Sequence, residues 1–345
     1  MQDIIQELWA TRTLSDEQLR QLLECTDSAV LEELCRLARD LREQHYGREV
    51  YIRGLIELTN ICRNDCYYCG IRRSNREVPR YRLSADDVLA CCAHGYDLGF
   101  RTFVMQGGED PYWTEPRLVT LIQEMRQRYP DCAITLSLGE WPQSAYEAFY
   151  EAGANRYLLR HESFDPEHYG QLHPQELSAR HRQDCLRALK AIGYQTGTGI
   201  MVGSPGQRTE HLVQDIRFIE ELQPEMIGIG PFLPHRQTPF RDEAAGSLEL
   251  TLKLLAIFRL MHPKALIPST TALATLHPEG RIRGILAGAN VVMPNLSPRE
   301  ERSKYQLYND KAALGAEAAE GLGLLAEQLA GIGYRLSHQR GDTLK

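Results

Sequence analysis

The sequence has few of the features that mark membrane, secreted or nucleic-acid-binding proteins. It contains no apolar run that approaches the roughly eighteen residues of a membrane-spanning helix. Its first residues, MQDIIQELWA, lack the charged and long apolar regions of a signal peptide, which favours a cytoplasmic location. Basic residues number 39 against 46 acidic ones, a net charge of −7, whereas nucleic-acid binding needs a basic surface. We therefore expect neither a membrane nor a nucleic acid as the main partner.

Cysteine is absent after Cys185, although the chain has nine cysteines. An odd number in a chain without a signal peptide speaks against a framework of disulfide bonds. The triplet Cys62, Cys66 and Cys69 is confined to one short segment. The remaining cysteines are interpreted as packing residues, because buried free cysteine behaves as a small hydrophobic side chain; they are Cys25, Cys35, Cys91, Cys92, Cys132 and Cys185.

Residues 1–48 are predicted to be helical. Ser15 and Gln18 have the spacing of a capping box, which marks the start of a helix. Leu34 and Leu41 recur at helical spacing, and Gly47 suits a helix C-terminus. We expect a helical extension over residues 1–48, one domain over residues 49–345, and a helical tail at about residues 311–333 within that domain.

Beyond residue 48, short apolar runs alternate with amphipathic helical stretches. This alternation is typical of α/β proteins with a parallel sheet, and eight strands would close a complete (β/α)8 TIM barrel, the predicted fold. An open doubly wound sheet is the alternative, but a Gly-rich turn should then follow the first strand, where this chain has TNICRNDCYYCG. The expected strands are Tyr51–Leu58, Thr102–Gln106, Ala133–Leu138, Arg156–Leu159, Gln195–Val202, Glu225–Ile229, Ala265–Pro268 and Asn290–Met293.

The loop Cys62-x3-Cys66-x2-Cys69 directly follows the first expected strand. Thiolates are soft ligands that suit iron–sulfur clusters or zinc. A structural zinc site needs four ligands, and no fourth Cys or His lies nearby. A 4Fe-4S cluster held by three thiolates instead keeps one iron open for a substrate or cofactor. Barrel enzymes build their active sites from the loops that follow the strands, so this loop is the candidate site.

The spacing of these cysteines resembles that of radical S-adenosylmethionine (SAM) enzymes, and Tyr68 before the last cysteine agrees with their usual motif. The resemblance implies that Cys62, Cys66 and Cys69 bind a 4Fe-4S cluster whose open iron chelates SAM. Reductive cleavage of SAM then gives a 5′-deoxyadenosyl radical, with the cofactors supplying the difficult chemistry.

The same resemblance implies positions that bind SAM. Gly107-Gly108-Glu109 resembles the GGE loop that receives the SAM ammonium group, although Gly-Gly alone is commonly a turn. Arg182 could make a fork to the SAM carboxylate, with Arg180 as the competing candidate. Arg160 and Glu162 are expected as a charged pair at a strand end, for which a surface ion pair is the alternative. The expected cofactor-binding set is Tyr68, Gln106, Gly107, Gly108, Glu109, Arg160, Glu162, Arg182 and Met201.

Over most of residues 45–310 the chain resembles the HydE family of [FeFe]-hydrogenase maturases. The resemblance is carried by loop motifs that occur in order, and it is therefore more specific than the cysteine spacing alone. These motifs include Gly108–Tyr112, Thr135–Pro142, Arg156–Glu162, Met201–Gly203, Ile227–Phe232, Thr270–Ala272, Met293–Asn295 and Tyr305–Tyr308.

The HydE resemblance implies a barrel cavity for a small organometallic or amino-acid-derived substrate, namely an iron carbonyl cyanide precursor carrying cysteine. It also implies a role in assembly of the H-cluster and transient docking with the maturases HydG and HydF. Hydroxyls and an arginine suit an anionic substrate, although each hydroxyl could instead be a satisfied turn residue and Met293 a packing residue. The expected substrate-binding set is Thr135, Ser137, Arg160, Thr270, Thr271, Met293, Tyr305 and Tyr308.

The lack of cysteine after Cys185 limits the alternatives. It excludes the auxiliary cluster that some HydE proteins bind near the C-terminus. Biotin synthase is disfavoured because it needs a second cluster as sulfur donor. A mutase similar to methylornithine synthase remains as a second enzymatic hypothesis, and a non-catalytic iron–sulfur carrier or scaffold as a hypothesis of another class.

Overall fold

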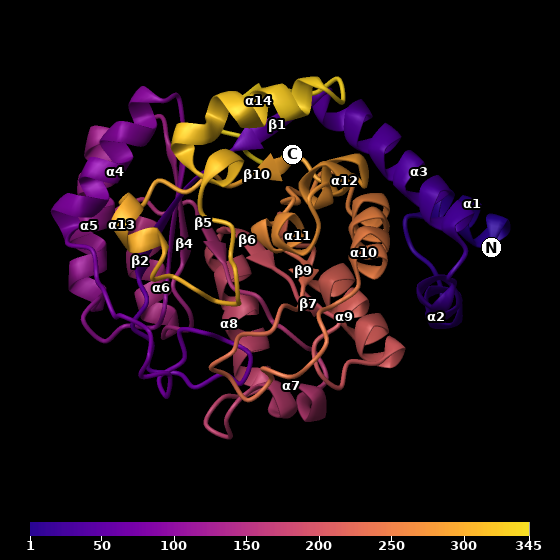
Figure 1. Ribbon diagram of the computed structural model, residues 1–345, viewed down its shortest axis with the longest axis horizontal. Helices are drawn as coiled ribbons and strands as arrows, with labels where there is room; N and C mark the ends of the chain where they lie inside the picture. The colour runs from indigo at the N-terminus through magenta and orange to yellow at the C-terminus, as the bar shows by residue number, and fades with distance from the viewer. Residues whose placement is uncertain (345) are drawn as a thin grey trace.

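A parallel sheet lies at the centre of the molecule and helices surround it (Figure 1). The computed structural model describes residues 1–344. Six strands form a continuous sheet in the order β2-β3-β4-β5-β6-β8, with every neighbouring pair parallel. The α/β class with a parallel sheet is therefore confirmed. These strands are β2 (Gly54–Thr59), β3 (Thr102–Gly107), β4 (Ala133–Ser137), β5 (Arg156–Leu158), β6 (Gln195–Thr198) and β8 (Met226–Ile227).

The strands are almost wholly buried, as expected for a sheet with helices outside it and side chains packed inside. Every residue of β2, with the sequence GLIELT, is buried. Pairing of Leu55 with Val104 and of Val104 with Thr135 continues in register from one strand to the next. Neighbouring strands are therefore aligned, and because they are parallel their carboxyl ends lie at the same end of the sheet.

Five further strands complete the sheets. β1 (Glu49–Ile52) lies between β10 (Val291–Val292) and β11 (Arg335–Ser337), and β7 (Met201–Val202) pairs with β9 (Gly230–Pro231). Isolated parallel bridges join Met226 to Leu266, Pro268 to Val291, and Leu55 to Asn295. These bridges link the edges of the six-stranded sheet to the segments on either side of it, while a closed eight-stranded barrel stays a prediction.

Several expected strands are shorter than the sequence suggests. The run Ala265–Pro268 was expected as a strand but forms only isolated bridges, because proline has no N–H to donate to a ladder. The run Gln195–Val202 is split at Gly199, where a Cβ atom would lie 1.9 Å from the carbonyl oxygen of Gly228. β11 was not expected at all, and the helical tail contains only α14 (Leu322–Ala330) after two short 3-10 turns, η1 (Gly315–Glu317) and η2 (Ala319–Gly321).

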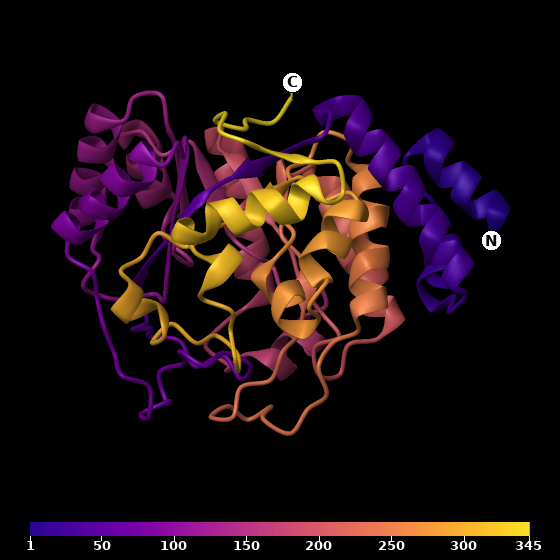
Figure 2. The same cartoon turned by 45° about the horizontal axis from the view of Figure 1, so that its top comes forward.

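The helices form an outer layer around the sheet (Figures 1 and 2). Ser84 caps α4 in a capping box with Asp87. α10 is buried along almost its whole length, because α3 of the N-terminal extension packs on its outer side. The layer consists of α4 (Ala85–Asp97), α5 (Glu115–Arg128), α6 (Gln143–Ala152), α7 (Pro166–Leu172), α8 (Ala179–Ile192), α9 (Thr209–Leu222), α10 (Leu248–Met261), α11 (Thr271–Leu276), α12 (Gly280–Leu286) and α13 (Arg299–Arg302).

The N-terminal extension consists of α1 (Gln2–Thr11), α2 (Asp16–Glu24) and α3 (Ser28–Tyr46), which confirms its helical character. Gly47 ends α3 with a φ of 58°, a conformation that glycine adopts without steric cost. Buried Lys253 of α10 donates to the carbonyl oxygen of Leu23 at 2.9 Å, so the extension is tied to the outer layer by a polar contact as well as by apolar packing.

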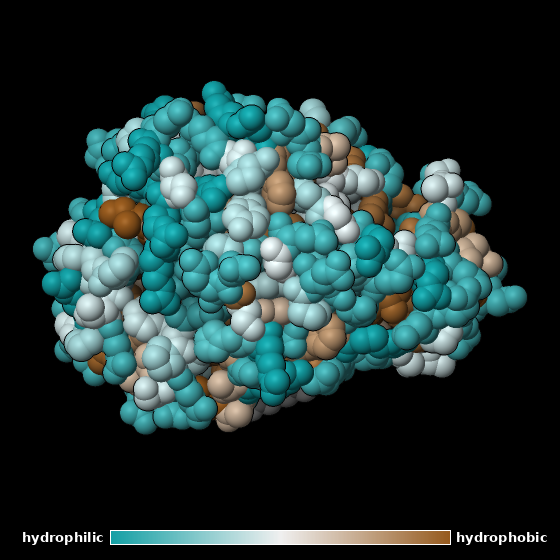
Figure 3. Space-filling model, turned by 90° about the horizontal axis from the view of Figure 1, so that it is seen from below, coloured by the Kyte–Doolittle hydropathy of each residue, from teal (hydrophilic) through white to brown (hydrophobic). Residues whose placement is uncertain are grey.

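The surface shows separate, small hydrophobic areas on a mostly hydrophilic face (Figure 3). Within residues 1–344, no helix is both long and apolar enough to cross a membrane. The apolar side chains of the fold are therefore directed mainly into the interior, as the large buried core indicates.

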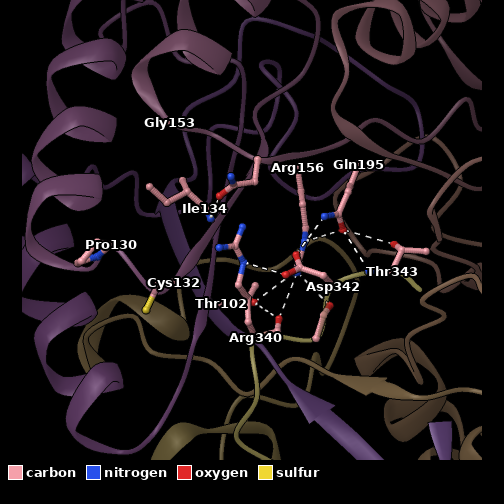
Figure 4. Close-up of polar contacts among 12 residues, drawn as sticks. Thr102, Pro130, Cys132, Ile134, Gly153, Arg156, Gln195, Arg340, Asp342 and Thr343 are labelled. Carbon is pink, nitrogen blue, oxygen red and sulfur yellow. Dashed lines mark hydrogen bonds and ion pairs between the residues drawn. The ribbon is translucent and has the colours of Figure 1, made fainter. Parts of the chain in front are cut away.

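The C-terminal segment closes the base of the sheet, which we define as the end where the strands begin (Figure 4). Arg156, the first residue of β5, is fully buried and donates to the Asp342 carboxylate at 2.7 Å and to the Gly341 carbonyl at 2.9 Å. Gln195 donates to Asp342 at 3.0 Å, and Thr102 donates to the Arg340 carbonyl at 2.8 Å. The segment therefore supplies a counter-ion for a guanidinium that the sheet buries.

An Asp342→Asn variant should be less stable at neutral pH. Burial opposes ionisation of Asp342, but hydrogen bonds from Arg156 and Gln195 outweigh it and keep the pKa of the carboxyl below its usual value. A lowered native pKa stabilises the fold above the unfolded-state pKa, and this gain is lost as the pH falls through the native pKa. Because the carboxylate is partly exposed, we expect a loss of about 1 kcal/mol at pH 7.

Urea unfolding of the two proteins at pH 7 and at acidic pH measures this effect. The difference between them should shrink as the pH falls, because Asp342 then becomes protonated and loses its charge in the wild type as well. Equal stability at pH 7 would show that the segment contributes no electrostatic stabilisation.

Candidate active site

A cavity of about 320 Å³ lies at the carboxyl ends of the central strands, where the loops after β2 and β9 extend from the same end of the molecule (Figure 2). All the expected cluster and cofactor residues line it, and most of the expected substrate residues do so too. The expected residues in its wall are Cys62, Cys66, Tyr68, Cys69, Gln106, Gly107, Gly108, Glu109, Ser137, Arg160, Glu162, Arg182, Met201, Thr270, Met293, Tyr305 and Tyr308.

The three cysteines of the loop are free thiols and half-buried at the cavity wall. Burial raises the pKa of all three thiols, that of Cys69 to about 12. Within the described residues, no three Cys, His, Asp or Glu side chains converge closely enough to hold one metal ion. Three thiolates from one loop suit a cubane cluster, which binds each of them at a different iron. The donor set therefore fits an iron–sulfur cluster.

Tyr68 is held in place by a histidine that the sequence analysis did not single out. Its hydroxyl lies 3.1 Å from Nε2 of His173, and Nδ1 of His173 lies 2.9 Å from the carbonyl oxygen of Tyr169. Burial lowers the pKa of His173 to about 3, so the ring is neutral. Nδ1–H donates to the carbonyl oxygen of Tyr169, and Nε2 accepts a hydrogen bond from the Tyr68 hydroxyl. This chain of bonds joins the cysteine loop to α7.

The Gly107-Gly108-Glu109 loop leaves β3 directly against the cysteine loop. A Cβ atom on Gly108 would lie 2.3 Å from the carbonyl oxygen of Ile61, so only glycine allows this approach. The Glu109 carboxylate forms an ion pair with Arg63 at 2.8 Å and accepts a hydrogen bond from the Glu140 backbone N–H at 3.2 Å. Its position is therefore defined from both neighbouring loops.

Arg160 and Glu162 form an ion pair at 3.0 Å in the cavity wall. Glu162 has a φ of 65°, a left-handed conformation that non-glycine residues rarely adopt. Beneath it, the fully buried His161 lies 2.8 Å from the Thr198 hydroxyl and 3.2 Å from the Asp215 carboxylate. These buried contacts fix the backbone of the segment and so hold Glu162 in its strained conformation at the cavity.

Arg182, and not Arg180, lies in the cavity wall. Arg180 is exposed to solvent, whereas Arg182 is buried and forms an ion pair with Glu140 at 2.7 Å. Arg182 also donates to the carbonyl oxygen of Arg160 at 3.2 Å. Glu140 belongs to a motif noted in the sequence, but its pairing with Arg182 spans 42 positions and could not be inferred there.

Two expected substrate residues lie outside the cavity wall. Thr135 belongs to β4 two positions before Ser137, so its side chain faces the same side of the sheet one layer deeper. Its hydroxyl is buried without a partner among the described residues. Thr271 begins α11, and its hydroxyl donates to the Glu317 carboxylate at 2.7 Å, so the structure does not support a direct contact with a substrate.

Tyr305 connects the cavity to a buried ion pair. Its hydroxyl accepts a hydrogen bond from Gln106 at 3.4 Å. Lys311 forms an ion pair with Glu57, lies 4.8 Å from the centre of the Tyr305 ring, and donates to the Tyr305 carbonyl at 3.2 Å. Asn295 donates to the Glu57 carboxylate at 2.8 Å. Neither Glu57 nor Lys311 was expected here, because they lie 254 positions apart in the sequence.

Comparisons with known proteins identify the family. Residues 56–219 match the sequence model of the Radical SAM superfamily. The chain is 43% identical over 300 residues to the [FeFe] hydrogenase maturase subunit HydE of Thermotoga maritima, a match that covers 87% of this chain and 85% of that protein. It is 32% identical over 297 residues to the 3-methylornithine synthase of Methanosarcina acetivorans, covering 85% and 83%.

Solved structures show the same fold. The crystal structure of methylornithine synthase (PylB) matches with a TM-score of 0.85 at 27% identity over 97% of both chains. That of HydG, a maturase of the [FeFe]-hydrogenase, matches with a TM-score of 0.81 at 20% identity over 98% of this chain and 76% of that one, which shows the fold alone. The chain therefore belongs to the radical SAM superfamily, whose enzymes use a 4Fe-4S cluster and SAM, and within it to the HydE family of [FeFe]-hydrogenase maturases.

Proposed function

We propose that this radical SAM enzyme acts in assembly of the H-cluster, on a cysteine-bound iron carbonyl cyanide precursor. The observation that carries the proposal is 43% identity to a HydE maturase over 87% of the chain, against 32% to methylornithine synthases over a similar length. The site adds a chemical reason, because its wall combines an arginine with hydroxyl groups that suit an anionic ligand.

The cluster would be held by Cys62, Cys66 and Cys69. Their thiols face the cavity, and a metal would displace the protons that burial keeps on them. When bound, the cluster supplies the electron that cleaves SAM to the 5′-deoxyadenosyl radical. The protein's own contribution is then to bind SAM, to orient the substrate and to keep water out.

SAM would bind next to the cluster, with its charged groups opposite the charged side chains of the wall. Arg182 is suited to the SAM carboxylate, and Glu109 and Glu162 to its ammonium group. Gly107 and Gly108 leave room for close approach of the backbone, while Gln106, Tyr68 and Met201 complete the wall. Arg182 and Glu109 already have protein partners in Glu140 and Arg63, so binding would require them to share or exchange these partners.

The substrate would lie deeper in the cavity. Arg160 is suited to an anionic cyanide-bearing or carboxylate-bearing ligand, and the Thr270 hydroxyl is buried without a partner among the described residues, so it is free to bond a ligand. Ser137, Tyr305, Tyr308 and Met293 would form the rest of this pocket. Thr135 would act one layer below, and no direct role is proposed for Thr271.

We further propose that residues 49–345, of which residue 345 lies outside the described residues, form one complete barrel domain behind the helical extension of residues 1–48. The bridges from Met226 to Leu266, from Pro268 to Val291 and from Asn295 to Leu55 support a closed ring, because together they connect the two edges of the six-stranded sheet. A closed barrel would leave the cavity open only at one end. Transient docking of HydG or HydF at that end would allow a reactive iron complex to pass without release.

The function is tested with anaerobically reconstituted protein. Electron paramagnetic resonance should show a reduced 4Fe-4S signal that changes when SAM is added, and chromatography should detect 5′-deoxyadenosine. A synthetic cysteine-bound iron carbonyl cyanide complex should increase its formation, whereas lysine should not yield methylornithine. Formation of methylornithine would contradict the maturase proposal, and the absence of any SAM cleavage would contradict both enzymatic hypotheses and favour a carrier or scaffold.

Two neighbouring arginines provide a matched pair of variants for the same assay. Arg182→Met should weaken SAM binding by about tenfold or more, because a charge-assisted contact is lost. Arg180→Met, on the same helix but exposed, should leave SAM binding unchanged. An equal effect of the two substitutions would contradict the proposed role of Arg182.

A further inference from the structure

A single guanidinium binds both ends of the cysteine loop. Arg80 donates to the carbonyl oxygens of Ile71 at 2.8 Å, Arg72 at 2.6 Å and Asn75 at 2.7 Å, and to that of Asn60. Asn60 comes just before Cys62, and Ile71 comes just after Cys69. The side chain therefore closes the segment that carries all three cysteines, without touching any of them through a hydrogen bond.

Neighbouring contacts define the rest of this loop. Asn60 donates from its side chain to the carbonyl oxygens of Pro79 and Lys304 at 2.8 Å each. Asp65 pairs with Arg72 at 2.7 Å, and hydrogen bonds from Arg72 and Ser74 keep the pKa of the Asp65 carboxyl well below its usual value. Arg72 is therefore neutralised by a carboxylate, and this distinguishes it from Arg80.

Arg80 has no carboxylate partner within the described part of the chain, and its side chain is half-buried against the loop. Its positive charge therefore remains available to the thiols. Its hydrogen bonds to the carbonyl oxygens of Asn60 and Ile71, each two positions from a cysteine of the loop, place this charge at the loop. The guanidinium is thus oriented by carbonyl dipoles next to the place where negative charge would collect.

We propose that Arg80 is a positioning residue for the cluster: it closes the cysteine loop before the cluster binds, and its unpaired charge favours the reduced cluster. Reduction adds one electron from the external reductant, and with it one negative charge, so a fixed cation nearby stabilises the product more than the reactant. At an effective dielectric of about 20, one unit charge within about 12 Å of the cluster changes the equilibrium by about tenfold or more. This role of Arg80 rests on the proposed function, because it requires that the cysteine loop binds a cluster.

Three variants separate the two parts of the role. Arg80→Gln removes the charge and keeps a shorter donor group. Arg80→Lys keeps the charge and loses the planar fork that reaches several carbonyls at once. Arg76→Gln, an exposed arginine on the same loop without an ion pair among the described residues, is the matched control for charge removal.

The first measurement is amide hydrogen exchange of the full chain before reconstitution. Residues 60–75 should exchange faster in Arg80→Gln and Arg80→Lys than in wild type, because carbonyl contacts that close the loop are lost. Arg76→Gln should match wild type. Unchanged exchange in both Arg80 variants would overturn the loop-closing part, and this readout needs no cluster.

The second measurement is a redox titration of the reconstituted proteins with dithionite, followed by electron paramagnetic resonance. In Arg80→Gln the ratio of reduced to oxidised cluster at a fixed potential should fall about tenfold, which equals 59 mV for one electron. Arg80→Lys should stay close to wild type, as should Arg76→Gln. Equal potentials in Arg80→Gln and wild type would overturn the electrostatic part and leave Arg80 as a structural contact only.

Loss of the cluster in a variant is also informative. If Arg80→Gln binds no cluster while Arg80→Lys does, the charge is needed for binding and the proposal is supported. If both fail to bind it, faster exchange before reconstitution supports loop closure and unchanged exchange overturns it. If the wild type itself binds no cluster, the proposed function fails, whereas the exchange experiment still decides the role of Arg80 in closing the loop.

Discussion

A Cys62→Ala variant is expected to purify as a folded protein that binds little iron and cleaves no SAM. Cys62 lies in the cavity wall at the start of the cysteine loop, where its sulfur accepts a backbone N–H from Asn64 at 3.4 Å. Only two thiols would remain in the loop, so the protein would bind the cluster through two ligands and no longer through three. The loss should exceed the 10–100-fold typical when a group that merely supports a ligand is removed.

The natural control for this substitution is Cys91→Ala. Cys91 is buried on α4 among core side chains and is not one of the residues that line the cavity. Its replacement should cost about 1 kcal/mol of stability and leave iron content and SAM cleavage unchanged. Iron and sulfide analysis together with the 5′-deoxyadenosine assay compares the two variants. Full activity in Cys62→Ala would place the cluster elsewhere and contradict the assignment of this loop.

The cysteine loop could be predicted from sequence because its chemistry is local. The spacing of three soft ligands, the aromatic residue before the last of them and the following Gly107-Gly108-Glu109 loop are all contained in short segments. Each motif at a strand end could therefore be assigned to the site by itself. The parallel sheet brings these strand ends together. Most predicted residues consequently line one cavity.

The contacts that could not be predicted join residues that are far apart in the chain or depend on how a helix packs. Arg180 and Arg182 point about 160° apart on a helix, and only the packing of α8 decides which one faces inward. The partners of the site residues, such as His173 for Tyr68 and Glu140 for Arg182, follow from that packing. β11 has too few residues to show a period, and its pairing with β1 depends on the folded sheet.

A Lys311→Met variant is expected to lose about 3–5 kcal/mol of unfolding free energy. The Glu57 carboxylate is completely buried, and Lys311, with 7% of its side chain exposed, supplies its only cation among the described ion pairs. Without Lys311 the carboxylate keeps one hydrogen bond from Asn295 but no opposite charge. Removing one partner of a buried ion pair leaves an uncompensated charge, which accounts for the size of the loss.

A double variant tests this explanation. Adding Glu57→Gln to Lys311→Met removes the second charge, so most of the lost stability should return, because replacing a whole buried pair is often close to neutral. Lys304→Met is the surface control, since Lys304 and Glu301 form a partly exposed pair at 2.8 Å whose loss should cost less than 1 kcal/mol. Urea unfolding measures all three. If the double variant is no more stable than Lys311→Met, the loss comes from packing around Tyr305 and not from charge.

The closed base of the sheet affects how the protein is made in the cell. The contact between Thr102 and Arg340 joins positions 238 residues apart. Arg156 and its ion-pair partner Asp342 are separated by 186 residues. A ribosome makes roughly 5–20 residues per second, so the early strands emerge many seconds before the segment that neutralises Arg156. During that time the nascent sheet exposes a lone cation and unpaired strand ends. Chaperones that hold such chains would therefore matter for this enzyme before any cluster does.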